Sequence, residues 1–305
     1  MKKLVLLLLL CPLMGLAQEK LSDAHYKIYS VKAGKEIQLK GIVQEMKDYD
    51  VLFFGEEHGD SVAHFLEKSI LELLQLKFGS ELALSMEMFD RDVQPVMTEY
   101  LKNFMREKSF IRDARAWTNY PDYKPMILFA KENGMDVICA NAPGRYAYLA
   151  GKRGQKGLEE LPEESKAFFA PVPYDTATGE YLGVLAGMAG HGPSAASIDS
   201  KTAASPGFYL NDAQSLWDAT MGYSISQYMK KNKIRKVFHI SGKYHTDAGF
   251  GVVAQLKNYN SKVKPLIISS NVGDDAFPNI DWSKYKKAGD FIIVTDPNIP
   301  RTFAD

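Results

Sequence analysis

The sequence feature that most constrains the fold is an apolar run, residues 51–54, that passes directly into Gly55, Glu56, Glu57 and His58. Such a run predicts a buried strand that ends abruptly in a polar loop. The following residues, 61–78, have the spacing of an amphipathic helix. In an open α/β sheet, ligands bind where strands end and helices begin. This stretch is therefore the first candidate for a functional site.

The same succession of strand and helix recurs along the chain. Strands are predicted at 82–86, 136–140, 236–240, 266–268 and 291–294, and helices at about 92–106, 124–133, 210–230 and 248–257. A short helix is expected at 42–47 and an edge strand within 18–40, whereas Trp117, Tyr120, Pro121 and Tyr123 suggest an aromatic loop. Alternation at this spacing predicts βαβ units and a mostly parallel sheet. Residues 151–208 lose the pattern, which indicates a flexible insertion of helices and loops.

The N-terminus has the pattern of a secretory signal peptide. Lys2 and Lys3 precede an apolar segment, residues 4–10, and cleavage after Ala17 is expected. Residues 18–305 then form one domain, with no membrane-spanning segment in the mature chain. Leu10 before Cys11 is a poor lipidation signal, so we do not expect a lipid anchor. The protein is expected to cross the inner membrane and to be periplasmic or associated with the outer membrane.

Composition excludes some classes of function and leaves the core as the main source of stability. Lys plus Arg and Asp plus Glu number 37 each, and without a basic tract nucleic acid is not an expected partner. Cys139 would be the only cysteine left after cleavage, so no internal disulfide is possible. The sequence also lacks G-x-S-x-G, a P-loop, H-E-x-x-H and C-x-x-C.

Polar residues recur where the predicted strands end. Glu56 and His58 follow one strand, Glu87 and His245 follow two others, and His64 lies near the start of the next helix. Neighbouring parallel strands bring their ends close together, so these side chains are expected to converge. Two kinds of chemistry suit them, a divalent metal held by Glu56, His58, His64, Glu87 and His245 or a general acid–base pair. His239 lies inside a strand and is expected to be a core residue.

Several of these motifs together resemble the ChaN-like haem-binding family, which belongs to a superfamily shared with the Tiki proteases and the erythromycin esterases. The resemblance is carried by G-E-E-H at 55–58 with His64, E-M-F-D-R at 87–91 with Gln94 and Pro95, and later blocks at 140–146, 214–221 and 241–252. It implies a three-layer α/β fold and a haem-binding envelope protein for iron uptake. It also implies a homodimer that encloses the porphyrin, with a possible envelope transport partner.

The resemblance further implies that tyrosine and histidine hold the haem. Tyr146 and Tyr120 lie beside motif positions, and His191 lies in the predicted insertion. Trp217 and Met221 could supply an apolar wall. A binding protein is expected rather than an enzyme. The alternative is a Tiki-like metal-dependent hydrolase that uses Glu56, His58, Glu87 and His245. A metal-free esterase with His58 as general base, and a scaffold without catalysis, remain open.

Overall fold

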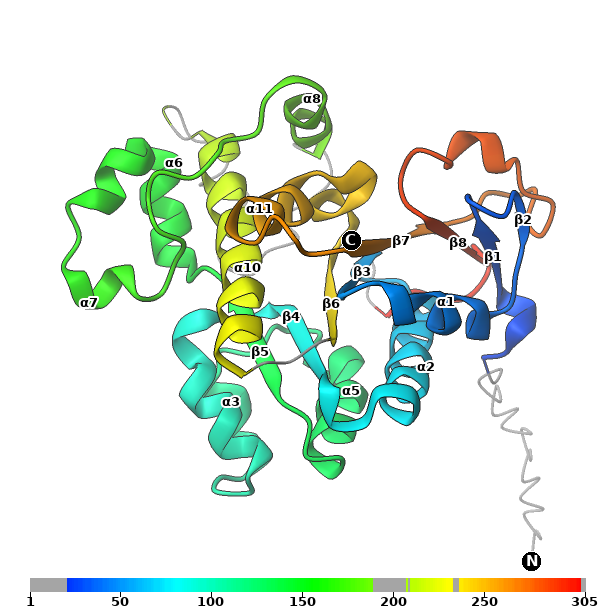
Figure 1. Ribbon diagram of the computed structural model, residues 1–305, viewed down its shortest axis with the longest axis horizontal. Helices are drawn as coiled ribbons and strands as arrows, with labels where there is room; N and C mark the ends of the chain where they lie inside the picture. Colours follow the sequence, from blue (N-terminus) through cyan, green and yellow to red (C-terminus); the bar gives the residue numbers. More distant parts are fainter. Residues whose placement is uncertain (1–20, 189–206, 208, 233–235, 303–305) are drawn as a thin grey trace, which may run out of the picture.

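The computed structural model describes residues 21–188, 207, 209–232 and 236–302. Its centre is a sheet with the strand order β2-β1-β8-β7-β3-β6-β4-β5 (Figure 1). From β8 to β5 all neighbours are parallel, whereas β1 runs antiparallel to β8 and to β2. The strands are β1 (Tyr26–Ser30), β2 (Lys35–Glu36), β3 (Val51–Glu56), β4 (Leu82–Asp90), β5 (Val137–Asn141), β6 (Lys236–Gly242), β7 (Pro265–Val272) and β8 (Phe291–Thr295).

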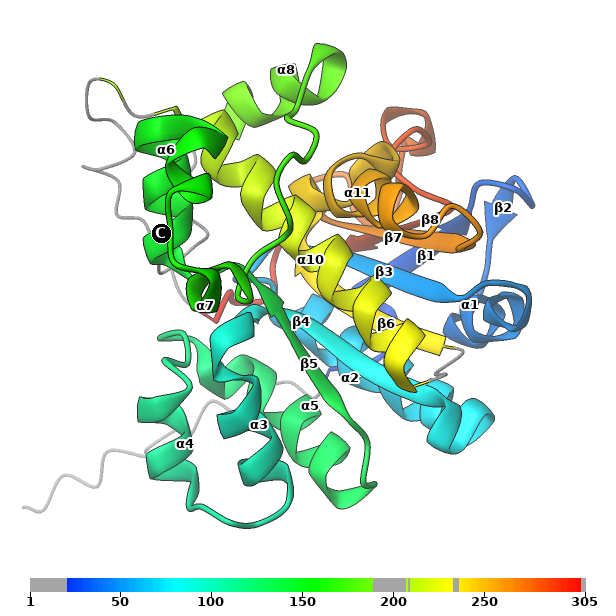
Figure 2. The ribbon, with the colours of Figure 1, turned by 60° about the vertical axis from the view of Figure 1, so that its left-hand side comes forward.

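Helices cover both faces of this sheet, so the predicted three-layer α/β fold is confirmed (Figure 2). One face packs against α1 (Leu39–Glu45), α2 (Ser61–Phe78), α3 (Gln94–Leu101), α4 (Glu107–Asp113) and α5 (Tyr120–Glu132). The other face packs against α6 (Gly144–Glu159), α10 (Leu210–Asn232) and α11 (Gly251–Tyr259). Two shorter helices, α7 (Glu163–Lys166) and α8 (Gly179–Met188), connect α6 toward α10.

The central strands are apolar on both sides because they are buried on both sides. In β3, Leu52 and Phe54 enter the core beneath α2, whereas Val51 and Phe53 enter the core beneath α10. Successive side chains of a strand point to opposite faces, so a continuous apolar run is what a covered parallel strand requires. The run that opened the sequence analysis therefore occupies the middle of the sheet.

One expectation about local structure was wrong. Tyr120, Pro121 and Tyr123 do not form a loop but the first turn of α5, where the fixed φ of proline is compatible with a helix. The unpatterned region after residue 151 contains helical structure over much of its described part. α6 extends to Glu159 through a kink at Gly154, where φ is 61°, and Phe169 is buried in the core beneath α10.

Candidate functional site

The candidate site lies where three adjacent strands end. β6 lies between β3 and β4, and the register pairs Glu56 of β3 with Gly242 of β6. Glu87 lies in β4 one residue beyond the pairing of Met86 with Ile240. His245 closes the short 3-10 turn that follows β6. The parallel sheet thus brings together side chains that are up to 189 positions apart in the sequence, from Glu56 to His245.

Two glycines allow the polar groups to approach each other closely. A Cβ atom on Gly55 would lie 2.4 Å from Thr246 Oγ1 and 2.8 Å from Lys243 Cα. One on Gly242 would lie 3.0 Å from His58 Nε2. The backbone N–H of Gly242 donates to Glu87 Oε2 at 2.7 Å. A larger residue at either position would displace the site, so both glycines are part of its construction.

The first of two polar clusters surrounds Glu56, which is buried at the end of β3. Its Oε1 accepts a hydrogen bond from the Tyr123 hydroxyl at 2.7 Å and lies 2.8 Å from His58 Nδ1. Its Oε2 lies 3.2 Å from His64 Nδ1, although the geometry is not that of a hydrogen bond. The same nitrogen lies 3.3 Å from Glu67 Oε2, and His64 Nε2 donates to the His58 carbonyl at 3.1 Å.

The charges in this cluster follow from burial and proximity. Burial opposes ionisation of Glu56, but the positive charge of His64 and the hydrogen bond from His58 outweigh it and hold the Glu56 pKa well below its usual range. Burial likewise opposes the His64 charge, yet Glu56 and Glu67 hold the His64 pKa well above its usual range. Burial and the nearby Glu56 charge raise the pKa of Glu67 well above normal. Of the two carboxyls beside His64, Glu56 therefore favours the ionised form and Glu67 the protonated form.

The second cluster is centred on His245, whose ring is held by Asp218 of α10. His245 Nδ1 lies 2.6 Å from Asp218 Oδ1, and the Tyr181 hydroxyl of α8 donates to Asp218 Oδ2 at 2.6 Å. His245 Nε2 lies 3.6 Å from Glu87 Oε1. Burial lowers the pKa of His245, but the charges of Glu87 and Asp218 outweigh it and raise that pKa to about 9. The imidazole is thus oriented through one nitrogen while the other faces Glu87.

His58 connects the two clusters. Its Nδ1 faces Glu56, and its ring packs edge-on against Trp117 at 5.2 Å between ring centroids. Its Nε2, on the side of Gly242, is buried without a hydrogen-bond partner among the described residues. Glu56 Oε2 and Glu67 Oε1 are also buried without a partner. Unpaired buried polar atoms carry a free-energy cost, so three of them at one site indicate a place for a ligand, a metal or water.

The predicted site residues are placed as follows. Glu56, His58, His64, Glu87 and His245 lie together at the strand ends, although their catalytic and metal-binding roles stay predictions. Within the described residues, the trio whose ligand atoms all lie within 4.8 Å of one another is Glu56, His64 and Glu67. Glu67 was not among the predicted ligands. Its position three residues after His64 on a helix was the available signal.

Sequence reasoning also missed Tyr123, Asp218 and Tyr181. Tyr123 was assigned to a loop, and Asp218 lies within a helix whose inward stripe seemed purely apolar. Only the packing of α5, α8 and α10 brings these groups to the strand ends. His239, in contrast, is a buried strand residue as expected, with Nδ1 2.9 Å from Ser85 Oγ.

The residues suggested for haem are separate from this site. Tyr146 is buried against Phe169 at 4.9 Å, and its hydroxyl accepts from Arg145 Nη2 at 3.2 Å. Trp217 donates to the Ala142 carbonyl at 3.2 Å, and Met221 lies in the same core. Tyr120 lies in the opposite core, against Phe110. His191 falls outside the described residues, so these haem-binding roles stay predictions.

The fold and the site define a class of protein, an α/β protein with a buried acid–imidazole centre at the ends of adjacent parallel strands. Residues 42–256 match the family described as haem-binding uptake, Tiki superfamily, ChaN. The chain therefore belongs to the ChaN family of the Tiki superfamily. Curated protein sequences give no match. No helix within the described residues is long and apolar enough to span a membrane.

Solved structures resemble this chain in fold. The structure of ChaN from Campylobacter jejuni, described as showing cofacial haem binding, has 16% identity and a TM-score of 0.63, covering 90% of this chain and 98% of that one. The type III effector HopBA1 has 12% identity and a TM-score of 0.42, with 85% and 94% coverage. A Bacillus cereus protein has 10% identity and a TM-score of 0.46, with 85% and 98% coverage.

Proposed function

We propose that this protein binds haem at the cell envelope as part of haem or iron uptake. The observation that carries the proposal is membership of the haem-binding uptake family over residues 42–256. The signal-peptide pattern of residues 1–17 supports export, although those residues lie outside the described part of the chain. Mass spectrometry of the exported protein tests this location. A mature N-terminus at Gln18 is expected, and retention of Met1 would contradict export.

The strand-end site does not fit a porphyrin. Glu56, Glu87, His64 and His245 are all less than 8% exposed, so no planar macrocycle reaches them without opening the core. Haem needs an accessible donor beside apolar surface, and ferric iron accepts an anionic oxygen ligand. The donor therefore has to come from elsewhere on the molecule.

Two tyrosines are exposed among the described residues, and they lie near each other. Tyr209 precedes α10 and is 63% exposed, and Tyr148 on α6 is 47% exposed. The backbone N–H of Tyr209 donates to the Gly151 carbonyl at 2.8 Å, which holds the start of α10 against α6. Tyr209 also borders the segment that carries His191. These features fit a haem ligand, so we assign the phenol oxygen of Tyr209 as donor in preference to the buried Tyr146.

A haem titration tests this function and this ligand. Apoprotein mixed with hemin should give a shifted Soret band, and Tyr209→Phe should weaken binding by about tenfold or more because it removes the donor oxygen. Tyr146→Phe is the matched control and should bind within about twofold of the wild type. A wild type without a shifted Soret band would contradict haem binding. If only Tyr146→Phe weakened haem binding, the haem function would stand and Tyr146 would be the ligand.

A metal-dependent hydrolase is the second candidate, and the unpaired atoms at the strand ends favour it. Glu56, His64 and Glu67 supply two carboxylates and an imidazole, a donor set that suits zinc or ferrous iron. A metal bound there would act as a Lewis acid and activate water. His245, oriented by Asp218, would hold or release a proton at Nε2 toward Glu87. The homodimer and the envelope transport partner that the family resemblance implies for this protein also stay predictions.

Elemental analysis separates this candidate from haem binding alone. Protein purified with added zinc should retain about one equivalent of zinc. Glu67→Gln should retain about tenfold less, because the second carboxylate ligand of the metal is lost. Glu72→Gln, on an exposed turn of the same helix, is the control. Zinc retained equally by all three proteins would exclude this trio as the metal site. No metal and no peptidase activity after metal addition would exclude the hydrolase.

A further inference from the structure

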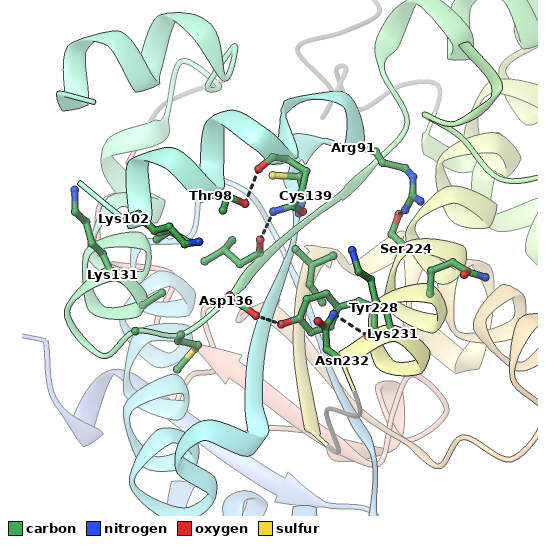
Figure 3. A pocket seen from close by; sticks show the side chains of 18 of the residues that line it. Arg91, Thr98, Lys102, Lys131, Asp136, Cys139, Ser224, Tyr228, Lys231 and Asn232 are labelled. Carbon is green, nitrogen blue, oxygen red and sulfur yellow. Dashed lines mark hydrogen bonds between the residues drawn. The ribbon is translucent and has the colours of Figure 1, made fainter. Parts of the chain in front are cut away.

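A groove of about 920 Å³ runs along β5, the edge strand of the sheet, on the side away from β4 (Figure 3). Its walls come from α3, from the end of α5 and from the C-terminal half of α10. The large apolar side chains of its lining that are partly exposed are Leu101 and Phe168, whereas Met135, Val137 and Ile138 are buried beneath it. This volume is within the range of about 300–1,000 Å³ that is typical of small-molecule sites. The groove is separate from the strand-end site.

The exposed edge of β5 is already satisfied by side chains. Gln94 Nε2 donates to the Val137 carbonyl at 2.9 Å, and its Oε1 accepts from the Cys139 N–H at 2.9 Å. Ser224 Oγ donates to the Ala140 carbonyl at 3.0 Å. An edge strand with free N–H and C=O groups could pair with a further strand. Here side chains already form hydrogen bonds with these backbone groups. The groove is therefore not suited to pairing with a peptide strand.

Arg91 brings a positive charge into the groove, and within the described residues it has no acidic partner. Its Nε donates to the Ala167 carbonyl at 3.0 Å and its Nη1 to Ser224 Oγ at 2.9 Å, and both acceptors are neutral. The neighbouring acids are engaged elsewhere, since Asp90 pairs with Arg115 and Asp92 pairs with both Arg115 and Arg145. Burial lowers the pKa of Arg91. A partly buried cation with only neutral partners is costly unless an anion approaches it.

Three lysines add to the positive charge around the groove, as Figure 3 shows. Lys102 and Lys231 make no ion pair within the described part of the chain, and Lys131 lies over the Tyr100 ring at 3.8 Å. The acid that lines the groove, Asp136, accepts a hydrogen bond from the Tyr228 hydroxyl. The groove thus combines the apolar side chains of Leu101 and Phe168 with an excess of positive charge.

We propose that this groove binds a small amphipathic organic anion. The anionic head, a carboxylate or a phosphate ester, would pair with Arg91, which offers planar donors for such oxygens. The apolar body would cover the partly exposed side chains of Leu101 and Phe168. Lys102 and Lys231 increase affinity through charge and do not define the head position. This proposal goes beyond the haem function and does not depend on it.

Calorimetric titration of the full mature chain tests the proposal with octanoate and octyl phosphate, which separate the two kinds of head. Octyl glucoside, below its micelle concentration, has the same chain without charge, and inorganic phosphate has charge without the chain. We expect at least one octyl anion to bind about tenfold more tightly than either control. The anion that binds more tightly identifies the head. Equal binding of octyl glucoside, or no binding of either anion, would overturn the proposal.

Variants locate the binding in the groove. Arg91→Gln should weaken the preferred anion by about tenfold, because a charge-assisted bidentate contact is lost. Lys102→Gln/Lys231→Gln alters only exposed side chains, so it should fold normally, and it should weaken binding by about threefold. Lys257→Gln, on the exposed side of α11, is the control. Equal losses in the Lys257 variant and in the double variant would overturn the assignment. A hemin titration of the same proteins reports the haem function separately.

Discussion

Glu56→Ala is expected to lower the free energy of unfolding by about 3–5 kcal/mol, because it breaks a buried ionic network from one side. The Glu56 side chain is fully buried, accepts from Tyr123 and faces the imidazoles of His58 and His64. Its removal takes away the carboxylate that faces both imidazoles and leaves the buried Tyr123 hydroxyl without this acceptor. Guanidinium unfolding of metal-free protein at pH 7 measures the loss.

Two comparisons make this result specific. Glu163→Ala removes one partner of an ion pair with Lys166 in which the glutamate is 85% exposed, and it should change stability by no more than about 0.5 kcal/mol. Glu56→Ala/His64→Ala should cost less than the sum of its single variants, because the unpaired charge is absent. A Glu56→Ala protein within about 1 kcal/mol of the wild type would show that the cluster is not the ionised network described here.

His239→Asn should remove a large part of the pH dependence of stability between pH 7 and pH 5. Burial, with a smaller effect from His245, lowers the His239 pKa from 6.5 to about 3. As pH falls below 6.5, the unfolded chain gains a proton at this residue that the folded chain does not bind, so stability falls until pH passes about 3. At pH 5 the loss from His239 is about 2 kcal/mol.

Urea unfolding at pH 7 and pH 5 gives the loss of stability over this interval for the wild type and for the variant. The effect is the difference between these two losses. Any packing cost of the asparagine is the same at pH 7 and pH 5, and the remaining histidines titrate in both proteins. The variant should therefore lose about 2 kcal/mol less than the wild type over this interval. Ser85→Ala removes the hydroxyl that contacts His239 Nδ1 but keeps the imidazole, so it should retain the wild-type pH dependence. Identical pH dependence in His239→Asn would show that His239 is not buried as a neutral group.

The regular elements of the central sheet could be predicted because their signal is local. The apolar run at 51–54 predicts a strand and the amphipathic spacing of 61–78 predicts a helix. The structure has β3 (Val51–Glu56) and α2 (Ser61–Phe78) at these places. The start of α5 was missed because Trp117, Tyr120, Pro121 and Tyr123 were assigned to an aromatic loop, whereas the structure begins the helix at Tyr120. The bounds of α6, α7 and α8 were not predicted, since α6 is interrupted by a kink at Gly154 and α7 has only four residues.

The site could be predicted in part. A polar residue after a buried strand is visible in one sequence, which is how Glu56, His58, Glu87 and His245 were found. Glu67, Tyr123 and Asp218 lie on helices, where a polar residue more often faces solvent than a strand end. Only their burial around the histidines distinguishes them, and burial depends on how each helix packs.

The sequence by itself determined the parallel α/β architecture and the places where strands end in acids and imidazoles, because both follow from the spacing of residues along the chain. The tertiary structure alone decided that these groups form two linked clusters, with His64 between Glu56 and Glu67 and His245 held by Asp218. It also decided that, among the described residues, Arg91 in the groove beside β5 has no acidic partner. These relations join residues that are distant in sequence, and their energies depend on burial and on distances of a few ångströms, neither of which the linear order of residues specifies.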